Sequence, residues 1–150
     1  MEMRRGAFQF GYWWIHVTWA GTIVHKVSFS RTGEEADIPL QLRQYLNGKV
    51  NGISPLTSVA LESDYPYSKI YREVSKIPYG ITKTYSEIAE ITKTNPRLVG
   101  NAMKRNPTPL IIPCHRVVAK EGIGGFTPDI EIKKSLLLME QKFSKSLNLS

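Results

Sequence analysis

Cys114, His115 and Arg116 are consecutive, and Cys114 is the only cysteine among the 150 residues. A histidine beside a thiol can accept its proton, directly or through a water molecule, and a nearby cation favours the thiolate. Because neighbouring side chains of an extended segment point in opposite directions, a water-mediated contact is easier to build than a direct one. The motif therefore predicts a nucleophilic thiol. The alternative is an inert cysteine, buried after the apolar run 110–112.

The cysteine count also limits the other kinds of site. A chain with one cysteine forms no internal disulfide, and a zinc site built from thiolates is excluded. We expect no metal and no other cofactor. A free thiol favours a reducing, intracellular location, which is the cytoplasm, or the nucleus in a eukaryote. No apolar run approaches the roughly 20 residues that cross a bilayer, so we expect no membrane association.

Positive charge is concentrated in the second half of the chain. The formal net charge is +7; residues 1–67 carry equal numbers of basic and acidic side chains, whereas residues 68–150 carry fourteen Lys and Arg against seven Asp and Glu. A segregated basic region is typical of modules that bind polyanions, because neutralised phosphates release counterions. The alternative is a basic surface that is merely solvated.

The first half of the chain is expected to hold strands followed by a helix. Residues 7–19 are rich in aromatic and β-branched side chains and predict one strand. Because the start of the chain is aromatic, we expect a strand there and not a signal peptide. Residues 23–29 alternate and predict a second strand, with a hairpin turn at Gly21. Helical spacing predicts a helix over 38–46, with Asp37 as its N-cap.

The proline-containing stretch 49–66 is predicted to be a linker, which divides the chain into domains of residues 1–66 and 67–150. After a helix that follows Ser68, residues 84–87 form a capping box, and Asn95-Pro96 is a cap with proline at the first helical position. Two short helices separated by a few polar residues predict a helix-turn-helix. A final helix is expected after a cap at Thr127-Pro128.

The second helix of this pair has an unusual face. Arg97, Gly100 and Lys104 are spaced i, i+3 and i+7, so they share one side of the helix. A glycine inside a helix costs about 1 kcal/mol relative to alanine, and a close approach to the backbone is one reason to keep it. A basic face with a gap fits nucleic acid, and the alternative is a solvated face with an incidental glycine.

The run Ile112-Pro113-Cys114-His115-Arg116-Val117 resembles the active-site motif of the O6-alkylguanine-DNA alkyltransferases. The resemblance covers about residues 67–141, while the first half agrees only in size and in the order of strands and helix. It implies an α+β fold: an N-terminal small ribonuclease H-like α/β domain, and a C-terminal winged-helix-like helix-turn-helix DNA-binding domain. Further matching positions are Asn106-Pro107, Tyr85, Ile88-Ala89, Arg97, Val99-Gly100, Ala102-Met103, Gly124-Gly125, Leu136-Leu137 and Glu140.

The resemblance implies a monomeric DNA-repair protein. Such a protein binds double-stranded DNA through the minor groove, rotates O6-alkylguanine out of the stack and transfers the alkyl group irreversibly to its own cysteine. Leaving the stack is required because a thiol cannot reach O6 inside the duplex. The thioether product is stable, so one molecule repairs one lesion.

Five residues take catalytic roles through this resemblance. Cys114 is expected to be the acceptor, and His115 the base that acts through water, with Glu140 as its partner. The amide of Asn106 is expected to brace the active-site loop. Tyr85 is expected to help rotate the target phosphate and to protonate the leaving guanine.

Five further assignments concern DNA and the target base, in addition to Tyr85. Arg97 resembles the finger that fills the vacated stack, and Gly100 and Lys104 lie on the helix that meets DNA. The carbonyl of Val117 is expected to face the guanine amino group, and Thr127 to hydrogen-bond O6. Arg116 is expected to form a structural ion pair between the two halves of the chain.

The loop after the paired glycines departs from the family pattern. Phe126 and Thr127 stand where the family usually has tyrosine and serine, and Pro128-Asp129 stands where small glycines are usual. We expect a stiffer and more negative pocket rim, which bears on the acceptance of bulky adducts. A zinc site of the kind that some relatives carry in the first half is not expected, because that half has His16 and His25 but no cysteine.

Two other function classes remain compatible with the residues. A cysteine hydrolase or peptidase also uses Cys and His, but it needs an oxyanion hole and turns over repeatedly. A helix-turn-helix regulator or a non-catalytic lesion binder would use the basic helix alone, and Cys114 argues against that class. Counting product against protein separates transfer from hydrolysis.

Overall fold

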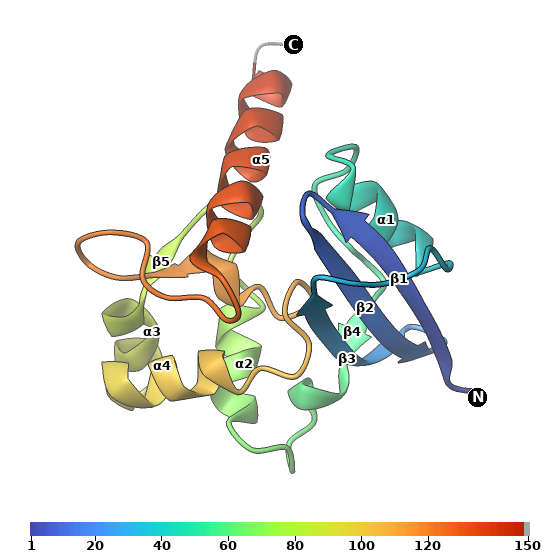
Figure 1. The fold of residues 1–150 in the computed structure, drawn as a ribbon. Coiled ribbons are helices and arrows are strands. Elements are labelled where there is room, and N and C mark those ends of the chain that lie inside the picture. Colours follow the sequence, from blue (N-terminus) through green and yellow to red (C-terminus); the bar gives the residue numbers. More distant parts are fainter. Residues whose placement is uncertain (149–150) are drawn as a thin grey trace.

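Three long strands dominate the first half of the chain in the computed structural model, which describes residues 1–148 (Figure 1). β1 (Arg4–Phe10), β2 (Trp13–Ala20) and β3 (Ile23–Ser30) pair antiparallel in chain order. The short strand β4 (Thr57–Ser58) lies parallel to β3 at the sheet edge. The helix α1 (Leu40–Leu46) packs against this sheet and completes a small α/β unit.

The pattern of β2 explains which face the helix covers. Ile15, Val17 and Trp19 are buried, whereas the residues between them are only partly covered, as expected for side chains that alternate across a strand. Leu42 and Leu46 of α1, four residues apart on one helix face, join them in one hydrophobic cluster. The sheet and the helix thus share a core.

Two predictions for this half are wrong. Residues 7–19 form two strands instead of one, because the chain turns at Gly11, whose φ of +63° lies in the left-handed region that glycine adopts without strain. Aromatic residues on both sides of Gly11 hide the turn in the sequence. The N-cap of α1 is Pro39 and not Asp37, and no side chain caps that helix.

The stretch 49–66 is more ordered than a linker. It contains β4 and the 3₁₀ helix η1 (Val59–Leu61), and the side chain of Ala60 is completely buried. Ser58 caps η1 by accepting a hydrogen bond from the backbone of Ala60 at 3.1 Å. This segment therefore belongs to the packed structure.

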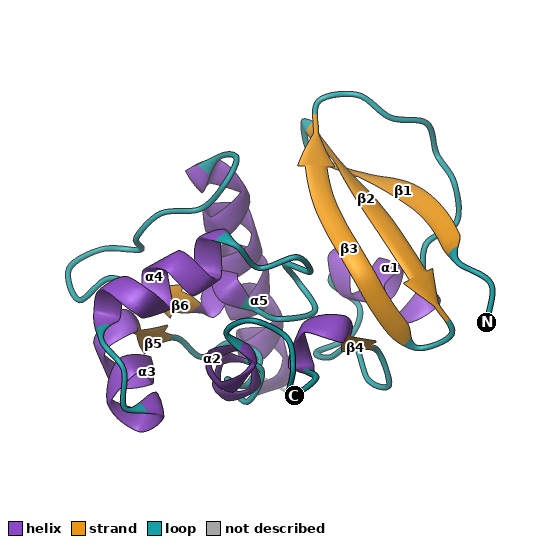
Figure 2. Ribbon diagram, turned by 90° about the horizontal axis from the view of Figure 1, so that it is seen from below, coloured by secondary structure: helices purple, strands orange, loops and turns teal. Residues whose placement is uncertain are grey.

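The second half is mainly helical and lies beside the sheet (Figures 1 and 2). Two very short strands pair parallel within it. In chain order its elements are α2 (Ser68–Val74), β5 (Lys83–Thr84), α3 (Tyr85–Thr92), α4 (Pro96–Lys104), η2 (Cys114–Arg116), β6 (Val117–Val118) and α5 (Ile130–Asn148). The predicted helix-turn-helix is confirmed as α3 and α4.

The caps of these two helices are those that the sequence predicts. The hydroxyl of Thr84 accepts a hydrogen bond from the backbone of Glu87 at 3.0 Å, and the carboxylate of Glu87 accepts one from the backbone of Thr84 at 3.1 Å. Asn95 accepts from the backbone of Leu98 at 2.9 Å, with proline at the first helical position.

The predicted cap of the final helix at Thr127-Pro128 is wrong. The side chain of Asp129 accepts from the backbone of Glu131 instead, at 3.0 Å.

Two hydrophobic clusters meet at the segment that leads to Cys114. The cluster of the sheet also takes Leu110 and Ile111 from this segment, and Leu136 from α5. The cluster of the helical half takes Ile112. The segment is thus held from both sides, which fixes the position of the thiol.

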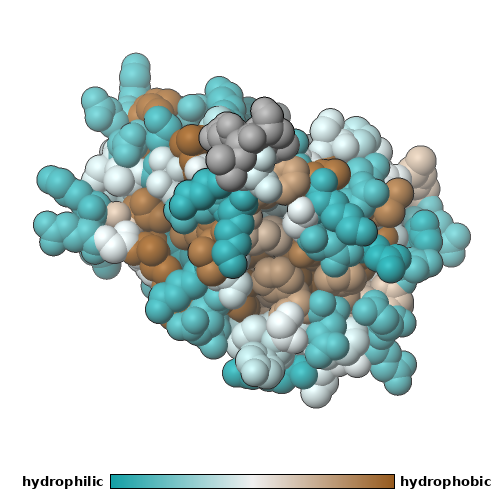
Figure 3. All heavy atoms as spheres, turned by 90° about the horizontal axis from the view of Figure 1, so that it is seen from above, coloured by the Kyte–Doolittle hydropathy of each residue, from teal (hydrophilic) through white to brown (hydrophobic). Residues whose placement is uncertain are grey.

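None of the helices within residues 1–148 combines the length and the apolar character that a bilayer span requires. Seen from above, hydrophilic residues cover most of the visible face, and apolar residues are gathered in its middle (Figure 3). A groove of about 490 Å³ lies between Gly48 and α5, and Leu138, Met139 and Phe143 line it.

Candidate active site

The turn before the thiol is held by Asn106. The amide nitrogen of its side chain donates to the carbonyl of Ile112 at 2.9 Å, and its side-chain oxygen accepts from the backbone of Thr108 at 3.0 Å. Leu110 in the same turn has a φ of 79°, a conformation that costs free energy for a residue with a side chain. The predicted bracing contacts of Asn106 are therefore present.

The first half of the chain also supports this turn. The backbone of Val27 in β3 donates to the carbonyl of Pro107 at 2.9 Å. The hydroxyls of Ser58 and Thr108, both buried, are 2.6 Å apart and share a hydrogen bond. The active-site turn is thereby tied to the sheet edge formed by β3 and β4.

Cys114 lies on a 3₁₀ turn and not on an extended segment. Its side chain is buried. Burial raises the pKa of the Cys114 thiol to about 11, although a hydrogen bond from Asn106 and the charge of Lys133 oppose the rise. The resting thiol thus keeps its proton at neutral pH, and a base has to remove it when it reacts.

The neighbouring His115 has the chemistry that such a base needs. Its Nε2 lies 2.7 Å from Oε2 of Glu140, so the contact expected between these two residues is present. Burial lowers the pKa of the His115 imidazole, which favours the neutral ring. A neutral ring that donates from Nε2 has its lone pair on Nδ1, and Nδ1 is buried without a hydrogen-bond partner among the described residues. The site therefore has a free acceptor one residue from the thiol.

Glu140 collects several donors. The guanidinium of Arg116 donates to it at 2.9 and 3.0 Å, the backbone of Gly80 at 3.0 Å and the hydroxyl of Tyr45 at 2.5 Å. Burial would raise the pKa of the Glu140 carboxyl, but the hydrogen bonds from His115 and Arg116 and the charge of Arg116 outweigh it and hold that pKa well below its usual range. The carboxylate stays ionised in the interior.

The predicted role of Arg116 as an ion pair between the halves is wrong. Its guanidinium pairs with Glu140 and donates to the carbonyl of Ile77 at 2.9 Å, and both partners belong to the second half. The two halves are joined at this place by the hydroxyl of Tyr45.

Sequence reasoning missed the buried Lys133. Its ammonium donates to the carbonyl of Val117 at 2.6 Å and to that of Gly125 at 3.2 Å, and burial lowers its pKa to about 8. A signal for it exists, because Lys133 precedes Glu140 by seven residues and so shares its face of α5. Sequence reasoning also missed Tyr45. Its hydrogen-bond partner Glu140 is 95 residues away in the chain, so no local pattern indicates the contact.

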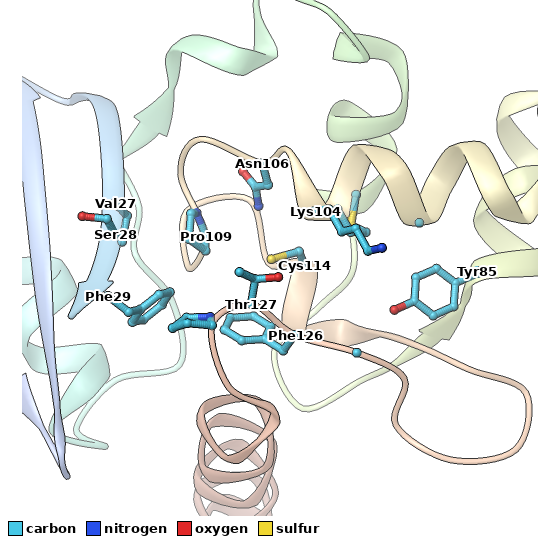
Figure 4. A pocket seen from close by; sticks show the side chains of 14 residues that line it. Val27, Ser28, Phe29, Tyr85, Lys104, Asn106, Pro109, Cys114, Phe126 and Thr127 are labelled. Carbon is cyan, nitrogen blue, oxygen red and sulfur yellow. The ribbon is translucent and has the colours of Figure 1, made fainter. Parts of the chain in front are cut away.

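A cavity of about 370 Å³ opens at the thiol. Figure 4 shows Tyr85 and Lys104 on one side of Cys114, and Phe29 of β3 on the other. The rings of Phe29 and Phe126 make an edge contact with centroids 5.7 Å apart, so Phe126 walls the cavity from below the thiol in this view. Six of the predicted site residues line it: Tyr85, Gly100, Lys104, Asn106, Cys114 and Thr127.

The remaining predicted residues lie outside the cavity lining. His115 and Glu140 are completely buried, and Val117 is buried in β6 with its carbonyl bound to Lys133. Arg97 is exposed on α4. A Cβ placed on Gly100 would have no neighbour within 4 Å, so the surface there is open. Helix α4 thus presents an exposed basic face that ends at the cavity.

Tyr85 closes the cavity on the side of α3. Burial raises the pKa of its hydroxyl, and the nearby Cys114 contributes to the rise. A phenol with a raised pKa keeps its proton at neutral pH, so the hydroxyl of Tyr85 is available as a hydrogen-bond donor. The cavity therefore offers a donor, a thiol and an apolar wall to one small molecule or base.

Comparison with known proteins is consistent with this site. Residues 66–142 match the family model described as 6-O-methylguanine DNA methyltransferase, DNA binding domain. The chain is 41% identical over 116 residues to the methylated-DNA–protein-cysteine methyltransferase of Thermococcus barophilus, a match that covers 76% of this chain and 66% of that one. The chain therefore spans just under two thirds of the length of that relative.

Two further matches agree. The methylated-DNA–protein-cysteine methyltransferase of Archaeoglobus fulgidus is 41% identical over 120 residues, which is 76% of this chain and 80% of that one. The Mycobacterium tuberculosis OGT protein, solved in complex with DNA, superposes with a TM-score of 0.71 at 27% identity, over 87% of this chain and 88% of that one. The matched segment contains the helix-turn-helix, the thiol, His115 and Glu140. The chain belongs to the family of methylated-DNA–protein-cysteine methyltransferases.

Proposed function

We propose that this protein repairs O6-alkylguanine in DNA by transferring the alkyl group to Sγ of its own Cys114. One observation carries the proposal. The buried thiol faces a cavity beside the basic helix α4; Nε2 of the neighbouring His115 contacts a carboxylate, and its Nδ1 has no partner among the described residues. The names of the relatives support the same reaction.

The chemistry balances with the residues at hand. Nδ1 of His115 takes the proton of the thiol through a water molecule, and the sulfur attacks the alkyl carbon. The bond between that carbon and O6 breaks, and its electrons stay on O6. Tyr85 donates the proton that lets the guanine leave neutral, and the hydroxyl of Thr127 hydrogen-bonds O6. The proton taken up by His115 returns through water to the phenolate of Tyr85, so the products are a thioether on Cys114 and a restored neutral guanine.

The reaction consumes the protein. A thioether carries no good leaving group, and no second thiol exists in the chain to remove the alkyl group. Each molecule therefore reacts once. A cysteine hydrolase would instead regenerate its thiol and form product beyond its own molar amount.

Double-stranded DNA is the proposed partner, with α4 in the minor groove. The open surface at Gly100 permits close approach of the DNA backbone, and Lys104 lies where the cavity begins. Arg97 enters the stack as the damaged base rotates into the cavity, where the carbonyl of Val117 accepts a second hydrogen bond, from the guanine amino group. A carbonyl oxygen has two lone pairs, so the bond from Lys133 does not prevent this.

The organisation of the chain follows from this activity. We place the DNA-binding and acceptor domain at residues 67–150 and a supporting domain at residues 1–66, which act as a monomer without a cofactor. A free thiol that must stay reduced until it meets a lesion is suited to the cytoplasm.

The test is to incubate the protein with duplex DNA that contains O6-methylguanine and to measure the mass of its peptides. The expected result is one methyl group per molecule, on Cys114, with unmodified guanine restored in equal amount. The control variant Cys114→Ser should bind the same DNA and leave the lesion in place. Repair without modification of the protein, or repair beyond its molar amount, contradicts the proposal.

A further inference from the structure

Tyr45 brings a side chain from the first half of the chain into the pair formed by His115 and Glu140. It lies on α1, outside the matched segment 66–142, and its side chain is 1% exposed. Its hydroxyl oxygen is 2.5 Å from Oε2 of Glu140 and 3.2 Å from Nε2 of His115. One phenol therefore touches both members of the pair that serves the thiol.

The distances define where the protons lie. Burial, and after it the charge of Glu140, raise the pKa of the Tyr45 hydroxyl well above its ordinary value, so it keeps its proton. That single proton goes to the carboxylate, which is nearer and charged. The phenol oxygen then faces the N–H of Nε2 as an acceptor. Both contacts favour the ring form with its proton on Nε2 and its lone pair on Nδ1.

The opposite arrangement would disable the site. If the hydroxyl donated to Nε2, His115 would carry its proton on Nδ1 and could not accept one from the thiol. We propose that Tyr45 is a positioning residue that holds His115 as the Nε2–H form and, by sharing Glu140, limits how strongly the ring binds a second proton. This inference rests on the proposed function, and the structure of the resting site can test it separately.

The sign of the effect follows from the groups around the ring. Several titratable or charged groups from different elements face His115 or its partner: Tyr45 on α1, Tyr79 in the loop after α2, Cys114 and Arg116 on η2, and Lys133 and Glu140 on α5. Glu140 favours the imidazolium, whereas Arg116 and Lys133 oppose it. A hydroxyl that donates to Glu140 disperses the negative charge on Oε2. Removing it strengthens the hold of Glu140 on the charged ring and raises the pKa of His115.

Tyr45→Phe and Tyr79→Phe form a matched pair for the experiment. The two rings make an edge contact with centroids 5.9 Å apart, and the Tyr79 hydroxyl is buried without a partner among the described residues. Each variant keeps its ring and loses one oxygen, but only Tyr45→Phe loses the bond to Glu140. The measurement is the single-turnover rate of methyl transfer between about pH 5 and pH 9.

Because only the neutral ring accepts the thiol proton, Tyr45→Phe should move the acid limb of the rate profile to higher pH. A rise of one unit in the pKa of His115 lowers the rate on that limb roughly tenfold. At the alkaline end the rate of the variant should approach that of the parent. Tyr79→Phe should follow the parent throughout. A loss by the same factor at every pH would assign Tyr45 a packing role only and overturn the inference, as would an unchanged profile.

Nitrogen NMR of His115 in the resting protein provides a second arm that needs no repair activity. The parent should show the Nε2–H form, and Tyr45→Phe should raise the pKa of the ring. An Nδ1–H form in the parent, or an unchanged pKa in the variant, overturns the inference. If the parent shows the expected ring form but never accepts a methyl group, the proposed function fails while the role of Tyr45 in the resting site remains.

Discussion

The ammonium of Lys133 donates a 2.6 Å hydrogen bond to the carbonyl of Val117, and so ties α5 to β6 beside the thiol. The same ammonium reaches the carbonyl of Gly125 in the loop that walls the cavity. A cation this deeply buried also favours the thiolate of Cys114, whose pKa it lowers against the effect of burial. One side chain thus shapes the cavity and assists ionisation.

Replacing Lys133 tests both effects. Lys133→Met keeps a long unbranched side chain and removes the charge, so we expect a higher thiol pKa and slower methyl transfer. A rise of one pKa unit lowers the thiolate fraction, and with it the rate, about tenfold. Single-turnover kinetics at neutral pH measure this. The control is Lys134→Met on the next residue, whose ammonium is exposed and pairs with the exposed Glu131; a loss of the same size there would mean that the effect is not local.

The buried amine also predicts how stability depends on alkaline pH. The pKa of Lys133 is about 8 in the folded protein and about 10.5 when exposed. Between these values the unfolded chain binds more protons at this residue than the folded one, so its contribution to stability rises with pH through that window. The free energy of unfolding, measured in urea, should therefore be higher for the parent relative to Lys133→Met at about pH 10 than at about pH 7. Cys114, whose thiol pKa we expect to be higher in the variant, changes the difference in the same direction, and the remaining titrating groups are common to both proteins. A difference that stays constant or shrinks contradicts the depressed pKa.

Glu140 should matter more for stability than any exposed carboxylate. Glu140→Gln keeps the shape but leaves the guanidinium of Arg116 partly buried without its counter-charge. Breaking a buried pair in this way costs about 3–5 kcal/mol, and we expect a loss of that order in the free energy of unfolding in urea. The exposed Glu131→Gln is the matched control on the same helix and should change stability by less than about 1 kcal/mol. Equal losses in the two variants would show that the network at Glu140 is not stabilising.

What the sequence predicts well in this protein is local. The capping box at Thr84 and the asparagine cap at Asn95 involve residues three apart, so the spacing of residue types is enough to place α3 and α4. The contact between His115 and Glu140 spans 25 residues and was expected through the family resemblance, not through spacing. Local patterns therefore placed the two helices, and the family resemblance predicted the contact between His115 and Glu140.

The missed features depend on contacts between distant segments or on a single backbone angle. The bond between Tyr45 and Glu140 joins residues 95 apart, and helical spacing shows only that Tyr45 is on a buried face. The turn at Gly11 depends on a positive φ inside an aromatic run that reads as a continuous strand. Arg116 pairs with Glu140, which is 24 residues away in the chain, and the spacing of residue types does not reveal this contact.

The exposed face of α4 gives the last prediction. Arg97→Ala removes the side chain proposed to fill the stack, so base rotation should be less favourable and methyl transfer slower. A fluorescent base analogue placed at the lesion should show a smaller change on binding, and the slope of log affinity against log salt should fall by about 1 if Arg97 also neutralises a phosphate. Arg5→Ala removes the same charge from β1, in the other half of the chain, and should leave rate, fluorescence and slope as in the parent. Transfer by Arg97→Ala at the parent rate, with a full fluorescence change, would show that another residue occupies the vacated position.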